Sequence, residues 1–164
     1  MKLATVTKHL TFDAAHYLLN PAKTKEENMV MFHKCCLYKE DGSEEPHGHT
    51  YHLEVSVTGV VSKENGYIID FKDLSKILKE GVVERMDHRL LNNIPYFDNC
   101  LATVENILHY VWDEIQPQID KLRPGEAWLD QIKMYETPNS YGTLTRAQWI
   151  TEHKTQRRGT IAYD

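Results

Sequence analysis

Two histidines one residue apart, in the tripeptide His47-Gly48-His49, are the residues of this chain whose spacing says most about chemistry. They open a segment that alternates polar and apolar residues as far as Val57, as a β-strand with one buried face does. Residues two apart on a strand point to the same side, so both imidazoles are expected on the apolar face. A buried histidine pair can bind a metal ion. The alternative is that both are ordinary polar residues at a strand start.

A third histidine, His16, ends another alternating segment, residues 2–16, and shares its apolar side with Phe12 and Ala14. Three neutral imidazoles that leave one coordination position open form a catalytic zinc site. Taken alone, His16 is better explained as a core residue whose ring nitrogens are satisfied by internal hydrogen bonds. Together with the histidine pair, it favours a metal site.

Two adjacent cysteines, Cys35 and Cys36, precede the histidine pair. In one interpretation a cysteine joins His47 and His49 in a closed structural zinc site, although the intervening segment is long for a compact zinc motif. In the other, the thiol stands beside the metal without binding it. The metal's charge would then lower the thiol pKa and make the cysteine a general base for proton abstraction from carbon or hydroxyl.

Two further sites carry carboxylates. Asp87 precedes His88 at the end of a predicted helix, where a carboxylate can hold an imidazole in one tautomer, although such a dipeptide is also common as a helix cap. Glu136 lies on the inward face of a predicted strand, and a buried carboxylate needs a partner. That partner is either an arginine or lysine of the chain or a ligand with an N–H/NH₂ edge, such as a guanidine-like heterocycle.

The elements that must position these residues follow from periodicity and turn signals. Strands are predicted at residues 2–16, 49–60, 128–136 and 142–150, with a short extended return at 67–69 that forms a hairpin with the second strand. Helices are predicted from Asp70 to Met86 and from Thr103 to Pro117. The polar segment 20–46 carries no predicted element. The order ββααββ indicates one α+β domain, with an antiparallel four-stranded sheet, two helices on one face, and edges that favour self-assembly.

Composition narrows the function classes. The 164 residues carry a net charge of −5, which argues against nucleic acid as a partner. No apolar run approaches the roughly 18 residues of a membrane span, so no membrane partner is expected. The first residues lack the features of a secretory signal, and three cysteines, two of them adjacent, suit a reducing compartment. We therefore expect a cytoplasmic protein.

Six short motifs, taken in order, resemble the 6-pyruvoyltetrahydropterin synthase family, and within it most closely the bacterial 6-carboxy-5,6,7,8-tetrahydropterin synthase branch. They are Phe12-Asp13-Ala14-Ala15-His16, His33-Lys34-Cys35, His47-Gly48-His49, Gly66-Tyr67-Ile68-Ile69-Asp70-Phe71, Met86-Asp87-His88-Arg89-Leu90-Leu91-Asn92 and Glu136-Thr137. The resemblance runs from about residue 8 to residue 145. It implies the tunnelling fold, in which ββααββ units assemble into barrels, and hence a homo-oligomer built from trimers, expected to be a hexamer.

The resemblance also implies a role for each candidate residue. His16, His47 and His49 would bind Zn²⁺, Cys35 would be the general base, Asp87 and His88 a second proton-transfer pair, and Glu136 the anchor of the pterin ring, with Thr103 and Glu105 near it. The implied substrate is 7,8-dihydroneopterin triphosphate, and no redox cofactor is required.

Several activities fit this resemblance. The expected one is a zinc-dependent lyase that makes 6-carboxy-5,6,7,8-tetrahydropterin on the route to queuosine and other deazaguanine compounds. The alternatives are a 6-pyruvoyltetrahydropterin synthase that eliminates triphosphate, an aldol cleavage of unphosphorylated dihydroneopterin, and a catalytically silent pterin-binding zinc module.

Two segments of the chain depart from the family pattern. An acidic loop at about residues 36–46 separates Cys35 from His47 by more residues than in the family, and it could displace the thiol. The segment from about 150 to 164 extends past the family core within what we expect to be one domain, residues 1–164.

Overall fold

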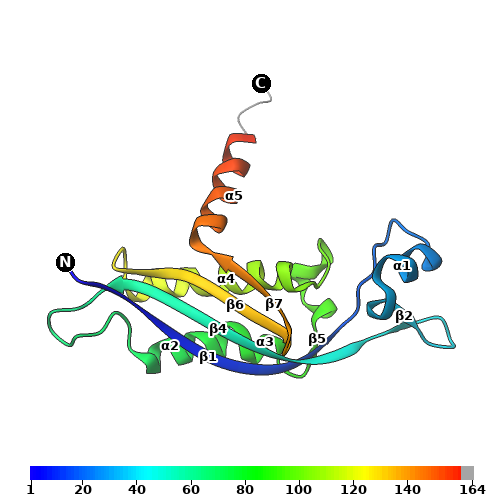
Figure 1. Cartoon of the computed structure of the whole chain (residues 1–164), viewed down its shortest axis with the longest axis horizontal. Helices are drawn as coiled ribbons and strands as arrows, with labels where there is room; N and C mark the ends of the chain where they lie inside the picture. The colour runs from blue at the N-terminus through cyan, green and yellow to red at the C-terminus, as the bar shows by residue number, and fades with distance from the viewer. Residues whose placement is uncertain (160–164) are drawn as a thin grey trace.

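A five-stranded β-sheet runs through the computed structural model, which describes residues 1–159, in the order β5-β1-β4-β6-β7 (Figure 1). Its strands are β1 Leu3–His16, β4 His47–Val60, β5 Arg89–Leu90, β6 Ala127–Thr137 and β7 Ser140–Thr145. The pairs β1–β4, β4–β6 and β6–β7 are antiparallel, as predicted. The two-residue strand β5, absent from the prediction, pairs in parallel with β1, so the expected count of four strands is wrong.

Helices cover one face of this sheet (Figure 1). They are α2 Phe71–Leu78, continued through a π-helical turn at Lys79–Val83 into α3 Glu84–Met86, and the long helix α4 Val104–Leu122. Short 3₁₀ turns at His33–Cys35, Leu91–Asn93 and Pro95–Asp98 complete the connections. The core lies between these helices and the sheet, with Trp112, Tyr51 and Leu74 among its fully buried side chains.

The predicted apolar faces of both N-terminal strands are the buried ones. Phe12, Ala14 and His16 of β1 are buried, as are the odd-numbered residues of β4 from Tyr51 to Val57. The opposite face is polar and open, with hydroxyl pairs across the strands, such as Thr5 with Thr58 at 2.7 Å. The sheet therefore offers one packed face and one face free to meet solvent or another copy.

Two predictions about the connections are wrong. Residues 67–69 form no hairpin with the second strand, because β4 has β1 on one edge and β6 on the other. Ile68 is instead buried, with a side-chain carbon 2.5 Å from where a Cβ at Gly59 would stand. The helix that was expected to stop at Pro117 continues to Leu122, because the residues around the proline pack on the sheet: the Gln116 amide oxygen accepts a hydrogen bond from Leu129 N–H at 3.0 Å.

Two further segments differ from expectation. Helix α1 Lys25–Phe32 and a hairpin of β2 Leu37–Tyr38 with β3 Glu44–Glu45 lie in the region 20–46, beyond one end of the sheet (Figure 1). The strand predicted at 142–150 ends at Thr145, where helix α5 Arg146–Gly159 begins and projects away from the sheet. The rest of the predicted C-terminal extension, residues 160–164, lies outside the described residues. Among residues 1–159, no helix combines the length and apolarity needed to cross a membrane.

Candidate active site

Three histidines meet at the end of the packed face of the sheet, where β1 finishes and β4 begins. The register pairs His16 with His47, and His49 lies two residues further along β4 on the same side. The Nε2 atoms of His16 and His47 are 3.0 Å apart, and one ring nitrogen from each histidine lies within 4.8 Å of the others. Nitrogen ligands of a tetrahedral zinc ion lie roughly 3.4 Å apart. The arrangement therefore suits a metal site.

The protonation of these rings also suits a metal. Burial lowers the pKa of all three histidines below the usual value, so the rings are neutral near pH 7 and offer lone pairs. A carbonyl can only accept, so His16 Nδ1–H donates to Ala102 O at 2.7 Å, and His16 Nε2 is left unprotonated. His47 Nδ1 and His49 Nε2 are buried without a hydrogen-bond partner. Orphaned buried nitrogens of this kind are what a bound ion would satisfy.

Glu136 lies beside the histidines, on β6. One of its carboxylate oxygens is 3.4 Å from His16 Nε2 and 3.8 Å from His49 Nε2. The side chain keeps 26% of its surface exposed, so the carboxylate borders both the cluster and the solvent. The inward direction predicted from its strand face is observed, and no arginine or lysine within residues 1–153 pairs with it by an ion contact. Its carboxylate is available to a ligand.

Cys35 and Cys36 lie in different environments. Cys35 ends a 3₁₀ turn that is tied to the end of β1, because Leu18 N–H donates to Cys35 O at 2.8 Å. Burial, and then the charge of Glu136, raise the pKa of the Cys35 thiol. Cys36 is buried, and its sulfur contacts the Tyr38 hydroxyl at 3.7 Å. In the described part of the chain, no cysteine sulfur joins the ligand group of the histidines.

The acidic loop does not carry Cys35 away from this region. Residues 37–45 form the β2–β3 hairpin, which leaves and returns beside the site. The segment before Cys35 is held by Asn28, a fully buried amide that donates to the carbonyls of Asn20, Lys23 and Thr24 and accepts from Asn20 N–H. The segment between β1 and β4, residues 17–46, thus contains regular elements and a buried polar centre at Asn28.

Thr103 and Glu105 lie at the start of α4. The Thr103 side chain caps the helix by accepting from Asn106 N–H at 3.5 Å. The carbonyl of Ala102, the residue before Thr103, accepts a hydrogen bond from His16. The backbone at the start of α4 is therefore held beside the histidine cluster. Glu105 is exposed in the first turn.

The Asp87–His88 pair is held at the edge of the sheet next to β1. Asp87 Oδ1 accepts from Asp13 N–H at 2.9 Å, and this bond, followed by the contact with His88, lowers the pKa of Asp87. The other carboxylate oxygen lies 3.0 Å from His88 Nδ1. The carboxylate of Asp13 accepts from the Thr50 hydroxyl at 2.5 Å. Sequence reasoning did not identify Asp13 and Thr50, whose register pairing across β1 and β4 could have pointed to them.

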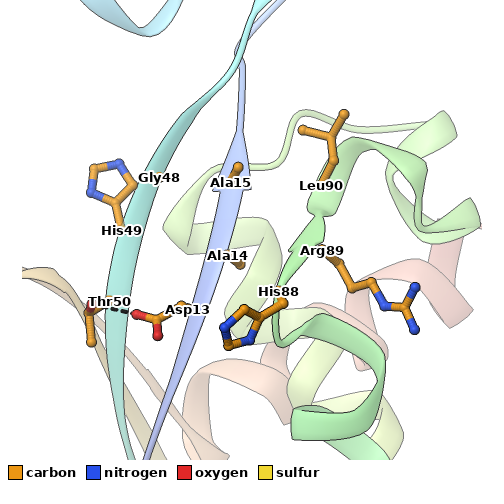
Figure 2. Close-up of a pocket in the computed structure, with 9 residues that line it drawn as sticks. All are labelled: Asp13, Ala14, Ala15, Gly48, His49, Thr50, His88, Arg89 and Leu90. Atoms are coloured by element: carbon orange, nitrogen blue, oxygen red, sulfur yellow. Dashed lines mark hydrogen bonds between the residues drawn. The ribbon is translucent and has the colours of Figure 1, made fainter.

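This pair and the histidine cluster use different faces of the sheet. Side chains alternate along a strand, so Asp13 points away from the side of Ala14 and His16. Figure 2 shows the Asp13 carboxylate and the His88 ring near each other at β1, with the His49 ring beyond β4. Asp13, Thr50 and His88 border a cavity of about 490 Å³ that His49 also lines. Among the described residues, Asp87 and His88 nevertheless form a ligand group with Asp13 that is separate from the three histidines.

Comparison with known proteins identifies a family whose matched segment contains all of these residues. A sequence model of a family described as 6-pyruvoyl tetrahydropterin synthase matches residues 5–147. Human 6-pyruvoyl tetrahydrobiopterin synthase is 33% identical over 138 residues, 84% of this chain and 88% of the human protein. A dihydroneopterin monophosphate aldolase of Pyrococcus furiosus is 40% identical over 99 residues, 60% of this chain and 76% of the aldolase. The structure of Caenorhabditis elegans 6-pyruvoyl tetrahydropterin synthase gives a TM-score of 0.75 at 27% identity, covering 88% of this chain and 96% of that one.

Proposed function

Because the chain belongs to the 6-pyruvoyl tetrahydropterin synthase family, we propose that it is a zinc-dependent lyase acting on 7,8-dihydroneopterin triphosphate. The observation that carries this proposal is the convergence of three neutral histidines beside Glu136, with one carboxylate oxygen 3.4 Å from His16 Nε2. A metal ligand set and a hydrogen-bond acceptor for a heterocycle thus share one site. Zinc held by the histidines would polarise the side-chain hydroxyls of the substrate.

Glu136 is the proposed pterin anchor. A pterin presents a ring N–H and an exocyclic amino group on one edge, and a carboxylate can accept from both. The partial exposure of Glu136 leaves room for such a ligand, while the nearby cluster would receive the substrate side chain. Thr103 and Glu105, at the start of α4, are proposed to lie along the bound ring.

Cys35 is the proposed general base. In the chain alone its thiol is held protonated by burial and by the charge of Glu136. A substrate that donates hydrogen bonds to Glu136 would weaken the second of these causes, and a cation on the histidines would lower the thiol pKa directly. The thiolate is therefore expected only in the loaded site. Cys36, buried against Tyr38, is not the base in this proposal.

The second proton-transfer pair, Asp87 and His88, is proposed to act from another copy of the chain. It lies on the open side of the sheet and forms a group separate from the three histidines of the same chain. The His88 side chain is 78% exposed, which leaves the ring free to enter a neighbour's site. We therefore propose a homo-oligomer, built from trimers and expected to be a hexamer, in which sites are shared between copies.

The proposed product is 6-carboxy-5,6,7,8-tetrahydropterin, in the route to queuosine and related deazaguanines. A second product, 6-pyruvoyltetrahydropterin, is favoured by the identity to the human synthase, and an aldol cleavage by the identity to the Pyrococcus furiosus aldolase. The experiment is product analysis after incubation of zinc-loaded protein with 7,8-dihydroneopterin triphosphate. The carboxy product with acetaldehyde is expected. A pyruvoyl product without acetaldehyde would replace the first assignment by the second.

A further inference from the structure

Tyr51 carries a buried hydroxyl that the mechanism so far does not use. The residue is 0% exposed, and its hydroxyl has no hydrogen-bond partner. Its ring stacks on Phe12 with centroids 5.1 Å apart and meets the rings of His49 and His16 edge-on at 5.6 and 6.4 Å. Leaving a buried hydroxyl unpaired costs stability, so such groups are uncommon in folded proteins. An apolar phenylalanine would fill the same space without that cost.

Tyr51 and Glu136 lie just beyond the last paired residues of β4 and β6. The pairing ends at His52 with Tyr135, and Glu136 follows at an irregularity in the register of β6 with β7. Both side chains contact the same two histidines, because the Tyr51 ring meets the rings of His16 and His49 and the Glu136 carboxylate lies 3.4 and 3.8 Å from their Nε2 atoms. Among the charged groups, the Glu136 carboxylate is the first to act electrostatically on the Tyr51 hydroxyl. A phenol carries an O–H, so Tyr51 can donate a hydrogen bond to a carboxylate.

Glu136 needs such a donor when the site is in use. In the chain as described, its carboxylate faces His16 Nε2 and His49 Nε2. Histidine nitrogens that serve a metal ion cannot also hold this carboxylate. We propose that Tyr51 is a positioning residue, whose hydroxyl donates to the Glu136 carboxylate and fixes its direction toward the amino edge of the pterin. This inference rests on the proposed role of Glu136 as the pterin anchor.

The test compares ligand selectivity in Tyr51→Phe and the unaltered protein. The probes are neopterin and its 2-oxo analogue, a lumazine with the same side chain, both added to zinc-loaded protein. Tyr51→Phe keeps the ring packing and is expected to weaken neopterin binding about tenfold, as for a hydrogen bond to a charged group, while the lumazine changes less. Zinc content should be unchanged. The matched control is Tyr110→Phe, which alters a buried tyrosine of α4 beside Arg85 and should leave both affinities unchanged.

Two further variants distinguish a wrong assignment of Glu136 as the anchor from a wrong role for Tyr51. Glu136→Gln should lose the preference for the amino edge. If it keeps that preference, both the anchor assignment and the role of Tyr51 are overturned. If Glu136→Gln loses the preference and Tyr51→Phe retains it, only the role of Tyr51 is wrong. A Tyr51→Phe effect on selectivity that disappears in a Cys35→Ala background would also overturn the inference, because the hydroxyl would then act through the thiol.

Discussion

At the scale of single residues, the proposed metal site requires histidine rings that stay uncharged. His16 is 1% exposed, its Nδ1–H is committed to Ala102 O, and burial lowers its pKa. The neutral ring leaves Nε2 unprotonated beside His47 and Glu136. The burial that suits His16 to the proposed role of metal ligand also makes metal binding sensitive to acid, because a proton and a metal ion compete for the same lone pair.

Acidification should therefore weaken the metal-free protein. The pKa of folded His16 lies below the unfolded value of 6.5, so the unfolded chain takes up the proton first. The contribution of His16 to the free energy of unfolding should be constant above about pH 7.5 and fall as the pH drops below 6.5, by at most about 1.4 kcal/mol per pH unit. Urea unfolding at a series of pH values measures it. His16→Gln should reduce the slope and the exposed-residue control His52→Gln should not; equal slopes in all three proteins contradict the account.

Cys35 gives a second prediction at this scale. Cys35→Ala removes the proposed base and should lower turnover by about 10²–10⁴-fold, with zinc content and neopterin affinity retained. Cys36→Ala and Cys100→Ala are matched controls, since all three thiols are free. Steady-state kinetics with metal analysis measures the effect. Full turnover in Cys35→Ala would remove the thiol from the mechanism and leave the silent pterin-binding module as the better explanation.

The elements differ in how well the sequence predicts them. Strands β1 and β4 have strict alternation, so their faces, and hence the direction of His16, His47 and His49, follow from the pattern alone. Helix α1 has no apolar stripe, and its signal was instead the capping box of Thr24 with Glu27, whose N–H groups and side chains bond reciprocally. The sequence does not predict which face of the sheet Asp87 and His88 occupy, because their position depends on the hydrogen bond from Asp13 N–H to Asp87, 74 residues away in sequence.

The segment between β1 and β4, which carries Cys35, gives the prediction at the scale of elements. Asn28→Ala removes the buried amide that joins Asn20, Lys23 and Thr24, so residues 18–38 should lose order and Cys35 its position. Hydrogen exchange should quicken there, and turnover should fall about tenfold or more while zinc content stays the same. Asn65→Ala, in an exposed turn, is the control. Faster exchange without any loss of turnover would show that this segment does not position the base.

At the scale of the whole molecule, the proposed mechanism makes one chain an incomplete site. Its histidine cluster and Glu136 lie on the packed side of the sheet, and Asp87 with His88 on the open side. The polar open face, the edge strand β7, and the part of β1 that the two-residue strand β5 leaves unpaired are surfaces that further copies can meet. Assembly is thus part of the proposed chemistry.

Mixing two inactive variants tests this sharing. Cys35→Ala and His88→Ala, unfolded together and refolded as mixed oligomers, should regain about a quarter of the normal turnover, the fraction of shared sites with both residues intact. Separate refolding before mixing is the control and should give none. If mixed oligomers form, as mass measurement in solution would show, and no activity returns, then each site takes both residues from one copy.

The central claim is that His16, His47 and His49 hold the metal on which pterin conversion depends. The most direct measurement is turnover of 7,8-dihydroneopterin triphosphate by chelator-treated protein as zinc is titrated back, with bound zinc measured in the same samples. The account predicts no turnover without metal and a linear rise that ends near one zinc per chain, with His47→Ala neither binding nor turning over. Turnover that survives chelation, or zinc that saturates His47→Ala as it does the unaltered protein, would contradict it.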